Sequence, residues 1–287
     1  MIAFYCQGGL GNQLFQYAAA RQLAARRDEE LVLDPYWFEH PRASETARPL
    51  ELLRYATRLR LARADEQLRW GLLRHRWAPY LGPFLPLRPI RERGVAYNAA
   101  VEKAPVNSYM FGFWQSEKYF KDIRRELLSE VQPIAPPSAA DSSVQDQMAK
   151  HTAISVHVRR GDYVTLNSAA IYHGVCSLDY YQRAIDHVTR RVENPALFIF
   201  SDDPVWTREN LRTPHPTYYV DHNSPLDAFQ DLRLMSHCTH HVIANSSFSW
   251  WGAWLANSPN QIVVAPEKWY QAGRPTPDLL PPHWIRL

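Results

Sequence analysis

The sequence predicts an α/β protein with two domains, each built on a doubly wound parallel sheet. Short β-branched apolar runs alternate with amphipathic stretches along most of the chain, which is the pattern of parallel strands joined by helices. A stretch rich in proline, alanine and serine, residues 131–143, interrupts this alternation and is typical of a linker. A chain of 287 residues is also long for one domain. We therefore divide it into residues 1–140 and residues 141–287.

Composition excludes several classes of protein. The 32 basic and 29 acidic residues give a net charge of only +3, so a nucleic-acid binder is not indicated and any anion site must be local. Cys6, Cys176 and Cys238 are odd in number and widely spaced, which predicts neither a disulfide framework nor a zinc site and fits a reducing compartment. Met1 leads directly into an apolar strand, and no apolar run approaches the ~18 residues of a membrane span. We expect a cytoplasmic protein without a signal peptide, at most peripheral to a membrane.

The first domain opens with a strand, a glycine turn and a helix. Residues 2–6 form an apolar run, residues 7–12 hold three glycines, and apolar positions recur on one helical face over residues 13–24. Residues 31–34 complete a β-α-β unit. Such a turn presents backbone N–H groups to a ligand oxygen. It lacks the lysine of a P-loop and matches the dinucleotide-binding pattern only in part, so a structural role is equally open.

The rest of the first domain is less regular. Leucines recur among many arginines over residues 45–78, which suggests amphipathic helices with solvated basic faces. The proline-rich residues 80–89 predict a surface loop. Residues 109–116 indicate a strand that runs into a turn, and residues 117–129 indicate a helix.

The second domain repeats the alternation and predicts a parallel sheet with helices on both faces. The expected strands are residues 153–156, 196–200, 217–220, 241–244 and 262–265. The expected helices are residues 178–192, 204–211 and 225–236, followed by a loop and helix over residues 245–255.

Polar residues follow three of these strands. They are His157-Val158-Arg159-Arg160-Gly161-Asp162-Tyr163, then Ser201-Asp202-Asp203, and then Asn245-Ser246-Ser247 at a helix start. The carboxyl ends of parallel strands meet at one edge of a sheet, where ligands bind. An arginine fork matches phosphate oxygens, a helix start offers N–H donors, and an aspartate can bind ribose hydroxyls or a base edge. Together these groups predict a site for a nucleotide diphosphate.

Other interpretations of the same residues stay open. The arginines and Asp162 could form a structural ion pair, and the serines after Ala244 could simply cap a helix. Asp202 and Asp203 could hold Mg²⁺ or Mn²⁺, but adjacent residues on an extended segment point to opposite faces, so we predict no metal site. The alternative functions are a carbohydrate-binding module, suggested by the aromatic content, and a metal-dependent phosphate hydrolase.

Three motifs, in order, span nearly the whole chain. They are Gly8-Gly9-Leu10-Gly11-Asn12-Gln13-Leu14-Phe15-Gln16-Tyr17-Ala18, the segment from His157 to Tyr163, and Asn245-Ser246-Ser247-Phe248-Ser249-Trp250-Trp251. These motifs resemble those of the α-1,2-fucosyltransferases of glycosyltransferase family 11. The second motif is shared more widely by α-1,2-, α-1,6- and protein O-fucosyltransferases, so an α-1,6-like linkage is the alternative activity.

The resemblance implies a galactoside 2-α-L-fucosyltransferase of the GT-B type, in which two Rossmann-like domains face each other across a cleft. Such an enzyme transfers L-fucose from GDP-β-L-fucose, with inversion and without a metal or other cofactor, to the 2-hydroxyl of a galactose-terminated oligosaccharide or surface polysaccharide. The C-terminal domain would bind the GDP-sugar and the N-terminal domain the acceptor. Animal members carry a membrane anchor that we do not find here. The chain therefore resembles bacterial members that act on lipopolysaccharide O-antigen in the cytoplasm, at most at the inner face of the membrane.

The resemblance also implies roles for individual residues. Arg159 contacts the GDP phosphates, and His157 and Arg160 shape the site. The nucleotide pocket is lined by Asp202, Asp203, Asn245, Ser246, Ser247 and Phe248 and closed from the other domain by Gly9, Leu10, Gly11 and Asn12. Direct attack by the acceptor hydroxyl would invert the anomeric centre and needs a base to take the proton. Asp162 is the first candidate for this base and His173 the second.

Overall fold

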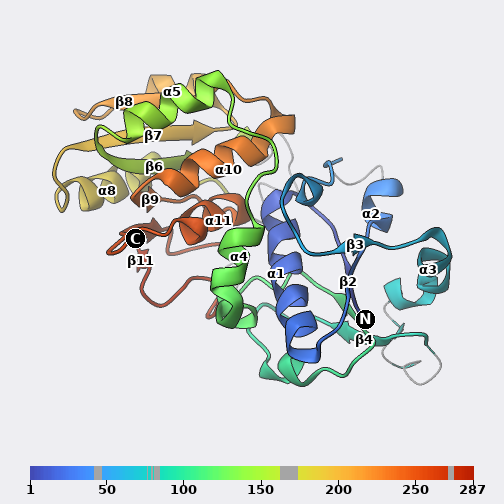
Figure 1. Cartoon of the computed structure of the whole chain (residues 1–287). Helices are drawn as coiled ribbons and strands as arrows, with labels where there is room; N and C mark the ends of the chain where they lie inside the picture. The colour runs from blue at the N-terminus through green and yellow to red at the C-terminus, as the bar shows by residue number, and fades with distance from the viewer. Residues whose placement is uncertain (42–46, 76, 79, 81–84, 162–173, 271–274) are drawn as a thin grey trace. The chain divides into compact units, whose positions relative to one another are not determined.

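The computed structural model describes residues 1–41, 47–75, 77–78, 80, 85–161, 174–270 and 275–287. The chain forms two compact units, each with its own sheet and helices (Figure 1). The first contains Met1–Ile134 and Thr276–Pro281, and the second contains Ala135–Pro275 and Pro282–Leu287. No helix within the described residues is both long enough and apolar enough to cross a membrane.

The first unit is built on a parallel sheet whose five described strands run in the order β3-β2-β1-β5-β4. The strands are β1 Ile2–Tyr5, β2 Leu31–Asp34, β3 Arg60–Leu61, β4 Arg88–Arg91 and β5 Ser108–Phe111. In the central strand β1, Ile2 is aligned with Leu31 on one side and Ser108 on the other. Every residue of β1 is buried, because helices or loops cover both faces of such a sheet.

Helix α1 (Leu10–Arg27) follows β1 and packs against it. Arg26 and Arg27 occupy its last turn, where the helix dipole favours positive charge. The other α-helices described in this unit are short. They are α2 Tyr36–Glu39, α3 Ala64–Arg69 and α4 Arg124–Glu130. Alternate residues of β1, Ala3 and Tyr5, pack with Trp70 and Tyr109 in one core cluster.

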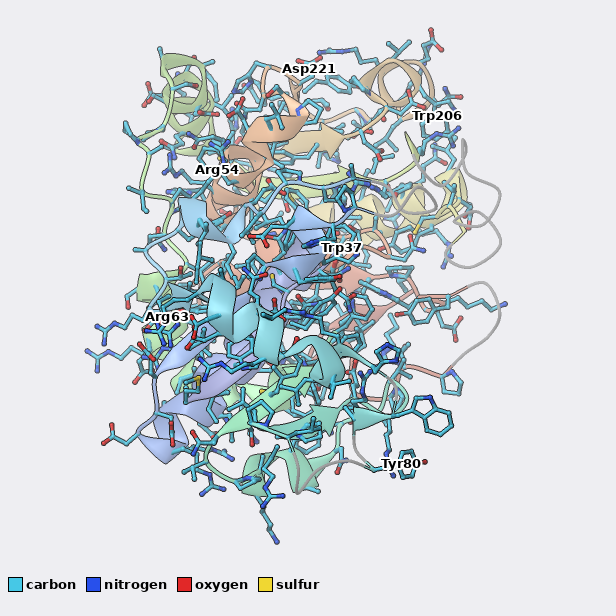
Figure 2. All side chains as sticks on the ribbon, turned by 90° about the vertical axis from the view of Figure 1, so that its right-hand side faces the viewer. Trp37, Arg54, Arg63, Tyr80, Trp206 and Asp221 are labelled. Atoms are coloured by element: carbon cyan, nitrogen blue, oxygen red, sulfur yellow. The ribbon has the colours of Figure 1, made fainter. Side chains whose placement is uncertain are left out.

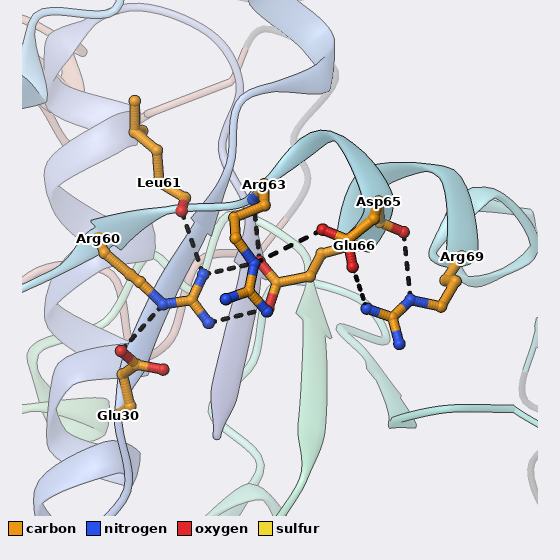
Figure 3. Close-up of polar contacts among 7 residues, drawn as sticks. All are labelled: Glu30, Arg60, Leu61, Arg63, Asp65, Glu66 and Arg69. Atoms are coloured by element: carbon orange, nitrogen blue, oxygen red, sulfur yellow. Dashed lines mark hydrogen bonds and ion pairs between the residues drawn. The ribbon is translucent and has the colours of Figure 1, made fainter.

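The arginine-rich residues 45–78 do not form the expected amphipathic helices. Within the described part of this range the only α-helix is the six-residue α3. Leu68 and Leu72 are 84% and 58% exposed, whereas Leu52 and Leu73 are completely buried, so the recurring leucines do not lie on one buried helical face. Polar contacts organise the segment instead: the buried Glu66 accepts hydrogen bonds from both Arg60 and Arg63 (Figure 3). The prediction was wrong because leucine spacing cannot distinguish side chains that point to solvent from those that point inward.

Two other local expectations for the first unit also need correction. Strands β3 and β4 are not anticipated by the sequence pattern, and β4 includes Pro89 at the end of the expected loop. Both are edge strands, where short length and a proline are tolerated. The helix expected over residues 117–129 is divided: the 3-10 helices Glu117–Tyr119 and Lys121–Ile123 precede α4.

The second unit holds a parallel sheet of six described strands in the order β11-β10-β9-β6-β7-β8. The strands are β6 Thr152–Val158, β7 Pro195–Ser201, β8 Thr217–Val220, β9 His240–Val242, β10 Val263–Ala265 and β11 Ile285–Arg286. All five strands expected from the sequence are present, and the short edge strand β11 is an addition.

Helices cover both faces of this sheet. They are α5 Ala139–Met148, α8 Leu178–Thr189, α9 Pro204–Asn210, α10 Ala228–His237 and α11 Ser247–Leu255. On one face, Ile154 and Val156 of β6 pack with Tyr181 of α8. On the other face, Phe198 of β7 packs with Leu234 of α10. Two α/β units with one parallel sheet each confirm the predicted fold class.

The stretch expected to be a linker contains the start of a helix. Ser138 Oγ accepts a hydrogen bond from the backbone N–H of Asp141 at 3.0 Å, and the Asp141 carboxylate accepts one from the backbone N–H of Ser138 at 2.9 Å. This reciprocal capping box begins α5 at Ala139, inside residues 131–143. The expectation of a linker rested on the proline and alanine content and overlooked the Ser-x-x-Asp spacing, which indicates a helix start.

Candidate functional site

The glycine turn of the first unit lies between the end of β1 and the start of α1. Gly8 has a φ of +80°, which favours glycine, and a Cβ there would crowd Nδ2 of Asn12 at 3.0 Å. Gly9 is the N-cap of α1 and has no side chain to cap it. Asn12 accepts a hydrogen bond from Gln115 Nε2 at 2.8 Å, which orients its amide. The start of α1 therefore has no side-chain cap, and the polarity of a helix start favours an anionic group.

The Gln13 side chain forms hydrogen bonds that link this turn to a segment distant in the sequence. We did not predict a role for this residue from the sequence. Its Nε2 donates to the carbonyls of Gly8 and Pro49, each at 2.9 Å, and its Oε1 accepts from the backbone N–H groups of Glu51 and Leu52, each at 3.0 Å. The side chain is completely buried. A glutamine beside a glycine turn was the available signal, but its partners in the distant segment, Pro49, Glu51 and Leu52, lie more than 35 positions along the chain and could not be read from local spacing.

An ion pair between Arg74 and Asp34 lies at the carboxyl end of β2, and its carboxylate accepts two further hydrogen bonds. Arg74 Nε and Nη2 donate to the two oxygens of Asp34 at 2.9 and 3.0 Å. Asp34 also accepts from the Tyr109 hydroxyl at 2.6 Å and from the backbone N–H of Tyr36 at 3.1 Å. The Arg74 guanidinium lies 4.0 Å above the Tyr36 ring, which in turn stacks on His40. These contacts brace α2, the short helix that also contains Trp37, which is labelled in Figure 2.

In the second unit, the arginine motif follows β6 and is held by the aspartates that follow β7. Arg159 Nε lies 3.1 Å from Oδ2 of Asp202, and the backbone N–H of Arg160 donates to Oδ1 of the same carboxylate at 2.8 Å. A Cβ on Gly161 would lie 2.8 Å from that Oδ2, so the missing side chain lets the loop approach Asp202. Strands β6 and β7 are neighbours aligned from Thr152 to Val158, which brings their ends together.

Arg160 is paired with the second aspartate. Its Nε lies 3.5 Å from Oδ2 of Asp203, and its guanidinium lies 3.7 Å above the ring of Trp206, which is labelled in Figure 2. Asp203 Oδ1 also caps α9 by accepting from the backbone N–H of Trp206 at 3.1 Å. Sequence reasoning did not identify Trp206. The two carboxylates thus pair with the guanidinium groups of different arginines. Among the described residues, no three His, Cys, Asp or Glu side chains gather as metal ligands.

His157 is buried at the end of β6. It is 4% exposed, and no described residue forms a hydrogen bond with its Nδ1. Burial lowers its pKa to about 4, with Arg159 acting in the same direction and Asp202 against it. The ring is therefore neutral near pH 7. Its centroid lies 5.6 Å from that of Phe248, next to the start of α11.

The start of α11 carries the last predicted group. Ser246 Oγ accepts from the backbone N–H of Phe248 at 3.3 Å and caps the helix, which begins at Ser247. Asn245 is buried, and its Nδ2 donates to the carbonyls of Gly174 and Trp269 at 3.1 and 3.2 Å. The Asn245 amide thus braces the loops around the helix start.

The structure gathers many of the predicted site residues, but not all. Arg159, Arg160, Asp202 and Asp203 form one cluster in the second unit, and His157 lies beside the start of α11. Residues 9–12 form the helix start of the first unit. Asp162 and His173, the two predicted bases, lie outside the described residues.

The chain is similar to known glycosyltransferases. The family model for Glycosyl transferase family 11 matches residues 96–287. The chain is 33% identical to the O-antigen biosynthesis glycosyltransferase WbnK of Escherichia coli over 98% of both chains. It is 31% identical to an alpha-1,2-colitosyltransferase of Escherichia coli over 98% of this chain and 96% of that one. A galactoside 2-alpha-L-fucosyltransferase SEC1 of Bos taurus is 33% identical over 56% of this chain and 51% of its own.

A solved structure supports the fold. FUT1 of Arabidopsis thaliana, solved in complex with GDP, superposes with a TM-score of 0.53 at 12% identity and covers 96% of this chain and 72% of its own. At that identity the likeness concerns the fold alone, which is of the GT-B class with two α/β units. The family match and the relatives that align along the whole chain show that this protein is a glycosyltransferase and belongs to glycosyltransferase family 11.

Proposed function

We propose that this enzyme transfers L-fucose from GDP-β-L-fucose to the 2-hydroxyl of a galactoside, with inversion, as a step in building an O-antigen. The observation that carries the proposal is the partly exposed Arg159 at the carboxyl end of β6, oriented by Asp202 and adjacent to the neutral His157. The activities for which the relatives are named support the linkage, the acceptor class and the pathway.

The charges of the second unit suit the departure of GDP. Breaking the bond between sugar and phosphate places negative charge on a phosphate oxygen and positive charge on the sugar ring. A guanidinium fixed by a carboxylate, together with N–H donors at a helix start, stabilises that negative charge without reorganising. In this proposal Arg159 and Arg160 face the diphosphate, while Asp202 and Asp203 hold the arginines. The start of α11 supplies further N–H donors.

A second donor deserves a direct test because one relative is named a colitosyltransferase. Colitose is L-fucose without its 3-hydroxyl, so the same phosphate site and the same attack would serve both sugars. Selectivity then depends on whether a polar group in the site needs that hydroxyl as a partner.

The experiment is a transfer assay with GDP-L-fucose and GDP-colitose in parallel, each with β-galactoside acceptors, and with linkage and anomeric configuration determined by NMR. We expect an α-1,2-fucosylated galactoside. Exclusive use of GDP-colitose would replace the donor and keep the chemistry, whereas an α-1,6 linkage or release of phosphate alone would refute the proposal. We also place the enzyme in the cytoplasm, at most peripherally bound to the membrane, which cell fractionation tests.

A further inference from the structure

Trp206 contacts the second arginine of the motif that follows β6. The guanidinium carbon of Arg160 lies 3.7 Å from the centroid of the Trp206 ring, over its face. The ion pair of the same side chain is long, because Nε lies 3.5 Å from Oδ2 of Asp203, at the limit of a hydrogen bond. The ring is therefore the closer of these two constraints on the Arg160 charge.

Helix α9 fixes the position of Trp206. Asp203 Oδ1 accepts a hydrogen bond from the backbone N–H of Trp206 at 3.1 Å, and Asn210 Nδ2 donates to the Trp206 carbonyl at 2.8 Å. The completely buried Thr207 donates to the Asp203 carbonyl at 2.7 Å and to Ser201 Oγ at 3.0 Å, which ties the helix start to the end of β7. The Trp206 side chain also packs against the core cluster shared by β6 and α8. The ring is thus anchored to the sheet.

An aromatic ring holds a guanidinium differently from a carboxylate. The ring attracts the cation through the negative charge of its face, whereas a bidentate carboxylate takes up two N–H donors. Arg74 in the first unit lies over Tyr36 and also bonds to Asp34 through Nε and Nη2. Arg160 lies over Trp206 and contacts Asp203 through Nε, and within the described part of the chain no acceptor takes up its Nη donors. The Trp206 contact therefore fixes a charge without using these donors.

We propose that Trp206 is a positioning residue for donor binding, which holds the Arg160 guanidinium with its Nη donors toward the diphosphate of the GDP-sugar. The inference rests on the proposed function, in which Arg160 faces that diphosphate. Trp206 acts through Arg160 and does not itself have to touch the donor. A guanidinium fixed in this way stabilises the negative charge of the departing phosphate without first reorganising.

The Trp206→Leu variant keeps an apolar side chain on the core and removes the ring face. We expect the Kd for GDP, measured by calorimetry, to rise by about 5- to 30-fold, the range of a partly desolvated cation–π contact. The acceptor KM should stay within about twofold. Trp206→Phe keeps a ring and should restore GDP affinity to within about threefold of wild type. A GDP Kd of Trp206→Leu within twofold of wild type would overturn the proposal.

A second contact between an arginine of α9 and an aromatic ring provides the matched control. The Arg208 guanidinium lies 4.2 Å from the centroid of the Tyr219 ring and pairs with Asp221, which is labelled with Trp206 in Figure 2. Tyr219, like Trp206, is partly buried against the same core cluster. Tyr219→Leu should therefore lower the Tm to a similar extent and leave the GDP Kd within about twofold of wild type. An equal loss of GDP affinity in both variants would assign the effect to packing of the unit and refute the positioning role.

A double-mutant cycle tests whether Trp206 acts through Arg160. In the Arg160→Gln background the guanidinium is absent, so adding Trp206→Leu should weaken GDP binding by less than about twofold further. Full additivity of the two losses would refute the inference. If Trp206→Leu does not fold, Trp206→Met takes its place under the same criteria.

The cycle also separates failure of this inference from failure of the proposed function. Weaker GDP binding in Arg160→Gln without weaker binding in Trp206→Leu would refute the inference alone. Wild-type GDP affinity in Arg160→Gln would remove Arg160 from the diphosphate site and the positioning role with it. If the GDP affinities follow the expected pattern but the wild-type enzyme transfers no fucose, the proposed donor sugar is refuted and the role of Trp206 stands.

Discussion

Each unit carries an arginine–aspartate pair at the carboxyl end of its parallel strands. We call Arg74–Asp34 in the first unit the closed pair and Arg159–Asp202 in the second unit the open pair, because they differ in exposure to solvent. In the first unit, Asp34 is 0% exposed and Arg74 11%. In the second unit, Arg159 is 21% exposed and Asp202 24%. The residue types and the strand-end position are the same, so exposure and the number of partners distinguish the two pairs.

The difference shows how the same chemistry can serve structure in one place and function in another. Both arms of the Arg74 fork bond to Asp34, and a tyrosine hydroxyl and a backbone N–H complete that carboxylate. Such a pair holds β2 to its neighbours and is inaccessible to a ligand. The Asp202 carboxylate instead contacts Arg159 through Nε and binds the backbone of Arg160, which orients a guanidinium that is still reached by solvent.

Breaking the closed pair should have the largest effect on stability. Asp34→Ala leaves the nearly buried Arg74 charge without its carboxylate, so we expect the free energy of unfolding to fall by about 3–5 kcal/mol in urea titrations. The matched control is Asp179→Ala, which removes the exposed i,i+4 partner of Arg183 and should cost less than about 1 kcal/mol. Equal effects of the two substitutions would show that the Asp34 pair is not the structural element we describe.

Changing the open pair should affect catalysis instead. Arg159→Lys keeps the charge and loses the planar fork, so we expect kcat to fall by about 10²- to 10³-fold, or about 2.7–4 kcal/mol, with little change in the free energy of unfolding. The control Arg183→Lys, at an exposed pair on α8, should leave kcat unchanged. Turnover of Arg159→Lys close to that of wild type would remove Arg159 from the phosphate site.

A smaller effect on binding should distinguish the acceptor, which we assign to the first unit, from GDP, which we assign to the second. Trp37→Ala in the first unit should raise the acceptor KM by roughly fivefold, corresponding to about 1 kcal/mol of lost aromatic contact, and leave GDP affinity nearly unchanged. Ser246→Ala should weaken GDP binding for every acceptor, because the cap of α11 is lost. Calorimetry with GDP on both variants decides the matter, and equal losses would contradict a division of donor and acceptor between the units.

The smallest expected effect is that of removing divalent cations. If arginines supply the positive charge at the diphosphate, as the open pair suggests, EDTA should leave the transfer rate unchanged within error. Restoration of a lost rate by Mn²⁺ or Mg²⁺ alone would favour the metal interpretation of Asp202 and Asp203.

The sequence alone determined the fold class and most of the second unit. Parallel strands that are buried on both faces appear in the sequence as continuous apolar runs. Because ligands bind at the carboxyl ends of such strands, the residue that follows each run lies at that edge of the sheet. For that reason Arg159, Asp202 and Ser246 could be placed at strand ends before any contact was known. The family motifs were equally local, since each lies within a dozen consecutive residues.

Tertiary structure decided what local patterns do not encode. Leu68 and Leu72 have helical spacing but face solvent, because burial depends on what lies opposite a residue and not on its spacing alone. The ion pair between Asp34 and Arg74 joins positions that are 40 residues apart in the sequence. The link from Gln13 to Glu51 spans 38 residues and leaves Glu51 buried beside the glycine turn. Side-chain pairing between distant segments follows from chain packing, so the environments that set charge and exposure appear only in the folded protein.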